Sequence, residues 1–143
     1  MRARDALDAS EALVLTMVLV AAADGGMTDR EIGMMAGQVQ TLPAFHDFTT
    51  EQFSTVTDAA VRLLNEDDGL QHAAGLMRGA LQPRLRETAY ALACEVVAAS
   101  DVASQRTLEM LGFVREELRL DSLIAAAIER GVRARHQRIE PSK

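Results

Sequence analysis

The sequence predicts an all-α protein: a compact bundle of about seven helices, with two pseudo-symmetric halves around two central apolar helices. Hydrophobic residues make up 48% of the 143 residues but aromatic residues only 3%, so Ala, Leu, Val and Met supply the apolar mass. Strands favour β-branched and aromatic residues, which makes a sheet a poor fit. Only three prolines occur, and long stretches lack any turn signal. Because the chain can bury one core and has no long linker, we expect a single domain over residues 1–143.

The first central helix contains the apolar run at residues 12–23, in which only Thr16 is polar. Asp8 or Ser10 could cap its start, since both side chains can accept a hydrogen bond from a free backbone amide. A helix that is apolar all round is buried on most sides, so this helix should lie at the centre of the fold. It should end at Asp24-Gly25-Gly26, because glycine readily adopts the left-handed backbone that closes a helix.

Two capping boxes predict the starts of the next two helices. They are Thr28-Asp29-Arg30-Glu31 and Thr49-Thr50-Glu51-Gln52. In a capping box the first hydroxyl accepts a hydrogen bond from the amide three residues later, and the side chain there accepts one from the first amide. Between the two helices, residues 41–48 should form a loop that buries Phe45 and Phe48.

Four further helices are predicted over residues 68–81, over residues 83–99, after Ser104, and after Asp121 or Ser122. The second of these starts with a proline, which suits a first helical turn, and it is the second central apolar helix. The spacing of apolar residues also predicts which side chains of the last two helices face inward. They are Leu108, Leu111, Leu118, Leu123, Ile124, Ala127 and Ile128.

The chain contains an internal repeat, with halves at about residues 11–46 and 88–122. A shift of 77 residues places Asp24 on Asp101 and aligns the apolar helices that precede them. Each half is then an apolar helix, an acidic turn that we call the elbow, a hydroxyl cap and an amphipathic helix. The second elbow is one residue shorter and has Val102 in place of glycine. Beyond the elbows, the aligned pairs are Thr28 with Ser104, Ile32 with Leu108, and Met35 with Leu111.

Asp24 and Asp101 each stand at the C-terminal end of an apolar helix, where the helix dipole is negative. An uncompensated carboxylate there costs about 0.3–1 kcal/mol, so the next helix N-terminus, an arginine or a bound cation should offset it. One interpretation is that both side chains cap the following helix or form Asx-turns. The other is a hard-cation site with Asp24, Glu31 and Asp101 as ligands, since Ca²⁺ and Mg²⁺ prefer carboxylate oxygens.

The stretch Ala21-Ala22-Ala23-Asp24-Gly25-Gly26-Met27-Thr28-Asp29-Arg30-Glu31 resembles the tellurite-resistance TerB family and its TerB-like domains. The resemblance extends over most of the chain. It implies an all-helical fold with two related halves, a role in tellurite resistance and stress responses, and metal binding at the acidic elbows. Asp24 and Glu31 match the family's first acidic pair and Asp101 its second Asp, whereas Thr107 stands where Glu is expected. The resemblance also implies protein partners near the inner membrane.

The charge pattern and the single cysteine limit the partners and the compartment. The net charge is −6, and residues 1–80 carry 5 Arg against 12 acidic residues, which argues against nucleic-acid binding. Cys94 cannot form an internal disulfide, which fits a reducing compartment. The start of the chain lacks an apolar signal core, and the run at residues 12–23 is too short to span a bilayer. We therefore expect a cytoplasmic protein without a transmembrane segment.

Glu95 is the one charged residue in the apolar part of the second central helix. It should pair with an arginine such as Arg84 or Arg62, or lie on a partly open face. Its neighbour Cys94 should be a small buried hydrophobe. Surface or loop positions are expected for the three histidines, His46, His72 and His136. The basic tail at residues 130–143 should fray.

Two functions remain open for this sequence. The first is a non-catalytic TerB-like stress-response protein that binds a divalent cation through the first elbow. The second is a metal-free helical module for protein–protein interaction, in which the elbows are structural. The sequence has no nucleophile elbow, phosphate loop or evident pair of catalytic carboxylates, so an enzyme is the least favoured class.

Overall fold

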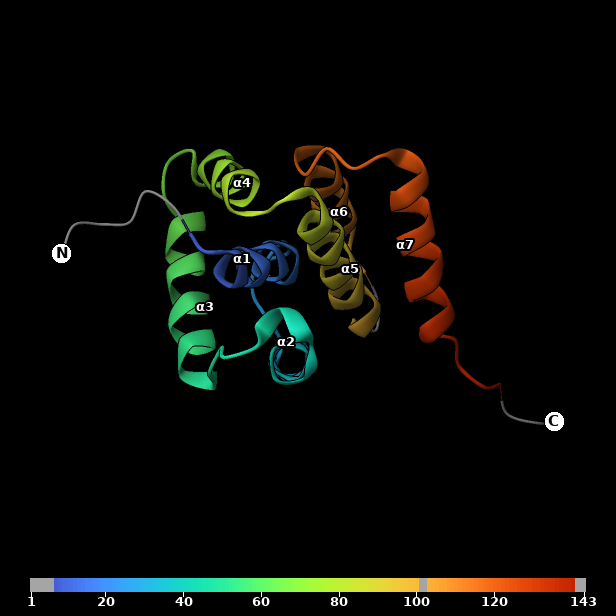
Figure 1. The fold of residues 1–143 in the computed structure, drawn as a ribbon. Helices are drawn as coiled ribbons and strands as arrows, with labels where there is room; N and C mark the ends of the chain where they lie inside the picture. Colours follow the sequence, from blue (N-terminus) through green and yellow to red (C-terminus); the bar gives the residue numbers. More distant parts are fainter. Residues whose placement is uncertain (1–6, 101–102, 141–143) are drawn as a thin grey trace.

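The computed structural model describes residues 7–100 and 103–140, and its regular secondary structure there is entirely helical (Figure 1). This confirms the predicted all-α class. The elements are α1 (Ala9–Ala21), α2 (Asp29–Thr41), the short 3-10 helix η1 (Pro43–Phe45), α3 (Thr50–Leu64), α4 (Gly69–Ala80), α5 (Pro83–Ala99), α6 (Gln105–Glu117) and α7 (Ser122–Arg135).

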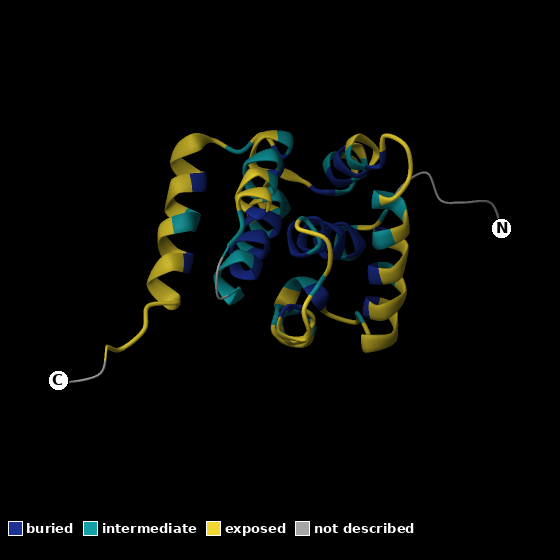
Figure 2. Ribbon diagram, turned by 180° about the vertical axis from the view of Figure 1, so that it is seen from behind, coloured by how far each residue is buried: buried dark blue, intermediate teal, exposed yellow. Residues whose placement is uncertain are grey.

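Helix α1 lies at the centre of the fold, as its apolar sequence predicts. Every residue from Glu11 to Ala21 is buried, and α2, α3, α4, α5 and α6 all pack against it. Thr16 is the one polar residue in the apolar run of this helix. Its hydroxyl donates to the carbonyl of Ala12 at 2.8 Å, so no buried polar atom of that side chain is left unpaired. Figure 2 shows α1 almost wholly buried behind the exposed outer faces of the other helices.

The two halves of the repeat exchange contacts across the pair α1 and α5. Helix α2 of the first half packs on α5, and α6 of the second half packs on α1. In the same way α3 covers α1 and α7 covers α5. The halves are not identical: α4 also packs on α1, whereas no described helix occupies the corresponding position on α5.

The helix starts follow the predicted caps. Asp8 caps α1 in a capping box with Glu11, and Thr28 caps α2 in a box with Glu31. Helix α1 ends at Ala21, three residues before Asp24, and the backbone of Gly25 then has φ 114°, the left-handed region that glycine tolerates. The local signals therefore predict both the end of α1 and the start of α2.

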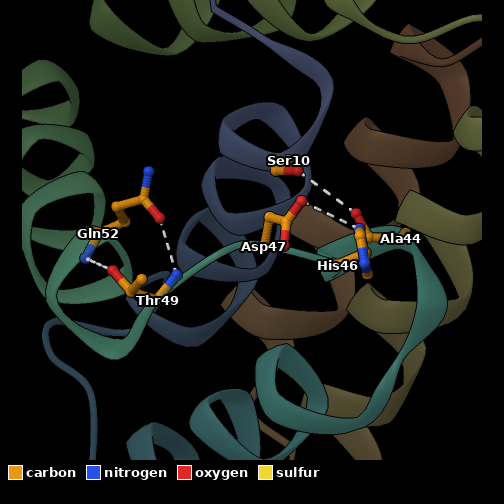
Figure 3. Close-up of polar contacts among 6 residues, drawn as sticks. All are labelled: Ser10, Ala44, His46, Asp47, Thr49 and Gln52. Atoms are coloured by element: carbon orange, nitrogen blue, oxygen red, sulfur yellow. Dashed lines mark hydrogen bonds and ion pairs between the residues drawn. The ribbon is translucent and has the colours of Figure 1, made fainter.

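The segment between α2 and α3 is joined to α1 by the side chain of Ser10, near the start of α1. The Ser10 hydroxyl donates to the carbonyl of Ala44 at 3.3 Å, while Thr49 and Gln52 form the predicted capping box of α3 (Figure 3). Phe45 is buried and Phe48 is half-buried, with ring centroids 5.6 Å apart. The predicted loop thus contains the η1 turn, and it inserts one aromatic ring into the core.

The predicted inward face of α7 is largely wrong, because of its four residues only Ile128 is half-buried and packs against the core. Leu123 is 76% exposed and Ile124 is 37% exposed, and Ala127 is also exposed; the buried residues are Ala125 and Val132. The reason is that α7 forms the edge of the bundle and packs mainly on the single helix α5, so only a narrow stripe is covered (Figure 1).

The prediction for α6 is only partly right. Leu118 is buried and Leu111 is half-buried, but Leu108 is 47% exposed. Leu108 lies in the first turn of α6 and faces an open cavity between α5, α6 and α7.

The expectation that the basic tail frays from residue 130 is wrong for residues 130–135, whereas residues 137–140 have no regular secondary structure. Helix α7 continues to Arg135, and Arg135 and His136 both contact Glu95 of α5. The helix end is held by these contacts, which join residues 40 or more positions apart and have no local signal.

Among the described helices, none has both the length and the apolarity needed to cross a membrane.

The central place of α1 predicts a large cost for truncating it. Leu19 is fully buried, so Leu19→Ala should lower the free energy of unfolding by about 2–5 kcal/mol through lost burial and a residual cavity. Chemical denaturation of the purified protein measures this change. The control is Leu123→Ala on exposed α7, which should change it by less than about 0.5 kcal/mol. Equal costs at the two positions would contradict the assigned roles of α1 and α7.

Candidate functional site

The first elbow leaves the Asp24 carboxylate exposed just beyond the end of α1. Within the described residues Asp24 makes no hydrogen bond or ion pair, and the following helix is capped by Thr28 instead. The expectation that Asp24 caps α2 is therefore wrong. Its negative charge lies near the negative end of the helix dipole without a described protein group to offset it.

Glu31, the second residue of the predicted cation site, is in a different situation. It is 8% exposed, and its Oε1 atom accepts from the Thr28 amide at 2.9 Å and from the Thr28 hydroxyl at 3.2 Å. Its Oε2 atom accepts from the hydroxyl of Ser100, the C-cap of α5, at 3.0 Å. Glu31 therefore caps its own helix and also joins the start of α2 to the end of α5.

Asp101, the third predicted ligand, lies outside the described residues. The structure therefore places Asp24 and Glu31 only. Within residues 7–100 and 103–140, no group of three or more His, Cys, Asp or Glu side chains is arranged to hold a metal ion. A three-carboxylate cation site at the elbows stays a prediction.

A second candidate site is a cavity of about 470 Å³ between α5, α6 and α7. Its floor is formed by Tyr90, Cys94, Val97 and Ala98 of α5. Its walls are formed by Leu108, Leu111, Gly112 and Arg115 of α6 and by Glu129, Val132, Arg133 and His136 of α7. Each set follows helical spacing, so one continuous stripe of each helix faces the cavity. Ligand-binding pockets commonly have volumes of this order.

The Glu129 carboxylate on α7 bonds residues of α5 and α6, and so joins the floor of the cavity to both walls. The Tyr90 hydroxyl donates to Oε2 of Glu129 at 2.5 Å, and Arg115 contacts the same oxygen at 3.3 Å. Burial and the bond to the Glu129 carboxylate raise the pKa of Tyr90 far above its ordinary value, so Tyr90 remains a neutral donor. The charge of Glu129 is thus shared between a donor from α5 and a cation from α6.

Glu95 lies just behind the cavity and is 8% exposed. Its Oε1 atom is 2.6 Å from Nε2 of His136, and its Oε2 atom is 3.0 Å from Nε of Arg135. The expected partners Arg84 and Arg62 are not the ones that bind it. His136 is exposed, as expected, and it also contacts Glu95 because the end of α7 brings it onto α5.

Cys94 lies on the cavity floor and is 5% exposed, in agreement with the prediction of a small buried hydrophobe. Burial raises the pKa of its thiol to about 11, and the negative Glu129 and Glu95 act in the same direction. The thiol is therefore protonated near neutral pH and is a poor nucleophile.

Sequence reasoning did not single out Tyr90, Arg115 or Glu129. A signal for one of them existed in the internal repeat: the alignment that pairs Met35 with Leu111 also pairs buried Val39 with exposed Arg115. An arginine at a position that is apolar in the other half indicates a site that is open in the second half. The contacts of Tyr90 and Glu129 had no such signal, since 39 residues separate them.

Comparisons with known proteins give no assignment for either site. No family model matches the chain, and neither the curated proteins nor the solved structures include a match.

The raised pKa of Cys94 predicts a shifted reactivity profile. In the folded protein the rate of maleimide labelling should keep rising until pH about 11, whereas in denaturant it should level off near the ordinary thiol value of about 9. Because the fold favours the protonated thiol, this group's contribution to stability is complete below pH about 9 and is lost as pH rises through about 11. Coincident folded and denatured profiles would contradict the burial of the thiol.

Proposed function

We propose that the chain is a non-catalytic, TerB-like helical module that binds a protein partner and uses its first elbow as a structural joint. The resemblance to the TerB family adds a role in tellurite resistance or a wider stress response. It also adds protein partners near the inner membrane, while the single cysteine favours a reducing, cytoplasmic location. The site geometry supports the choice of a metal-free module over a cation-binding one.

The observation that carries this proposal is the engagement of Glu31. Its two oxygens already accept three hydrogen bonds from Thr28 and Ser100, and a carboxylate offers about four acceptor positions. A cation would have to replace bonds that cap α2 and hold it to α5. Glu31 is therefore better suited to a structural role than to coordination.

The acidic groups around the cavity also favour binding over catalysis. Glu95 is paired with Arg135 and His136, and Glu129 is bonded by Tyr90 and Arg115. A general acid or base needs a carboxyl group that can exchange its proton near neutral pH. The oxygens of both carboxylates already bond these side chains, so a substrate would have to displace protein partners to reach them.

Exposed apolar side chains on α7 support a protein partner. Leu123 and Ile124 are adjacent and open to solvent, and Ala127 lies one turn further along. Apolar groups that gather on an exposed helix are typical of surfaces that another protein covers.

A cation site at the first elbow is the second candidate function. Asp24 is the observation that favours it, because this carboxylate is exposed at the unfavourable end of α1 and has no partner among the described residues. Its proposed ligands are Asp24, Glu31 and Asp101, and its proposed ion is Ca²⁺ or Mg²⁺.

Calorimetric titration with Ca²⁺, Mg²⁺ and Zn²⁺ distinguishes the two candidates. A metal-free module should give no binding heat, and a chelator should leave its melting temperature unchanged. Asp24→Ala and the control Asp29→Ala remove the same charge from exposed positions, and only the first changes a proposed ligand. Binding heat that Asp24→Ala abolishes and Asp29→Ala keeps would overturn the proposal in favour of the cation site.

The partner surface is tested by the double variant Leu123→Ser, Ile124→Ser. Because both side chains are exposed, the melting temperature should stay within about 2 °C of the wild type. Quantitative capture of cellular proteins on the immobilised chain should show reduced retention of specific partners. Ile32→Ser changes an apolar residue on α2 that is as exposed as Ile124, and it serves as the control. Identical retention by all three proteins would show that this part of α7 is not a binding surface.

A further inference from the structure

We propose that the cavity between α5, α6 and α7 binds a small anionic amphiphile: one apolar chain that ends in a carboxylate or phosphate group. This inference goes beyond the proposed partner binding, because it concerns a different surface and a different class of ligand. It rests on the shape of the cavity, on its unbalanced charge and on a comparison of the two halves of the repeat.

The shape of the cavity suits an apolar chain. Its middle is lined by Cys94, Leu111 and Val132, one from each of the three helices, and Val97 and Leu108 extend this apolar lining. Leu108 is 47% exposed and Leu111 is half-buried, so apolar surface in the cavity is still open to water. Covering that surface with a hydrocarbon chain is favourable by the ordinary hydrophobic effect.

The comparison of the halves shows that the helix pair around this cavity packs less closely than the aligned pair of the first half. In the first half α2 packs on α3, with Met35 and Val39 both buried. In the second half the aligned residues are half-buried Leu111 and exposed Arg115, and α6 and α7 make no comparable packing contact within the described residues. The aligned helices therefore pack against each other in the first half and leave a cavity between them in the second.

The charges of the cavity favour an anion. Glu129 is balanced by Arg115, and Glu95 is balanced by Arg135. Arg133 also lines the cavity, and it makes no ion pair in the described part of the chain. One cationic group is therefore left over, and a ligand with an anionic head would neutralise it.

The width of the cavity favours a thin ligand over a partner helix. Arg115 of α6 and Glu129 of α7 form an ion pair from wall to wall, 3.3 Å between their charged atoms. A docked α-helix is about 10–12 Å across, so it would have to separate the two walls and break this pair. A single hydrocarbon chain has no such requirement.

Decanoate and decyl phosphate are the probes for isothermal titration of the purified full chain. Both should bind, and the tighter of the two identifies the preferred head group. Decyltrimethylammonium, which carries the opposite charge on the same chain, should bind at least tenfold more weakly. Octanoate should bind roughly fifteenfold more weakly than decanoate, because it lacks two methylenes and each buried methylene contributes about a fourfold factor.

Gly112→Leu tests the location of the site. A Cβ atom added at Gly112 meets no atom within 4 Å, so a side chain can start there without a clash, and Gly112 faces the cavity. It should weaken decanoate binding at least tenfold. Gly131→Leu is the matched control, because this helical glycine is equally open and lies outside the cavity lining. Arg133→Gln should reduce the preference for decanoate over decyltrimethylammonium to less than threefold.

Three results would overturn the proposal. One is that neither decanoate nor decyl phosphate binds. Another is equal affinity for decanoate and decyltrimethylammonium in the wild type, which would show a simple apolar surface. The third is decanoate binding that Gly112→Leu and Gly131→Leu change equally. None of these results bears on the cation titration or on partner capture, so failure here is distinguishable from failure of the proposed function.

Discussion

The burial of α1 is the constraint on which the rest of the structure depends. A helix with apolar residues on every side cannot present a face to water, so its neighbours must enclose it completely. Helices α2, α3, α4, α5 and α6 supply that enclosure from both halves of the chain. Because helices of the second half are needed to cover a helix of the first, the repeat folds as two interlocked units rather than two adjacent ones.

The second central helix follows the same plan with a different balance of forces. Helix α5 carries Tyr90 and Glu95 where α1 is apolar, and these groups need polar partners when they are buried. Helix α7 supplies those partners through Glu129, Arg135 and His136. Coverage of α5 therefore depends on a few polar contacts at the edge of the bundle, where packing is less complete and a cavity remains.

The features that the sequence predicted well are those with local causes. Helix starts follow from residues three positions apart, as in Thr28 with Glu31, and the central place of α1 follows from its composition. The exposure of Leu123 and the pairing of Glu95 with His136 depend instead on which helix lies beside α7, and no local pattern encodes that choice. At the candidate elbow the sequence identified Glu31 as important. Its bond to Ser100 joins residues 69 positions apart and could only come from the structure.

That bond has a consequence for how the molecule opens. The carboxylate of Glu31 holds the first turn of α2 with one oxygen and the last residue of α5 with the other, so fraying at either helix end removes a support from its counterpart. Local opening events usually occur separately in different parts of a protein. The shared Glu31 carboxylate should therefore couple opening of the two helix ends, so that amide exchange near Thr28 and near Ser100 is expected to change together.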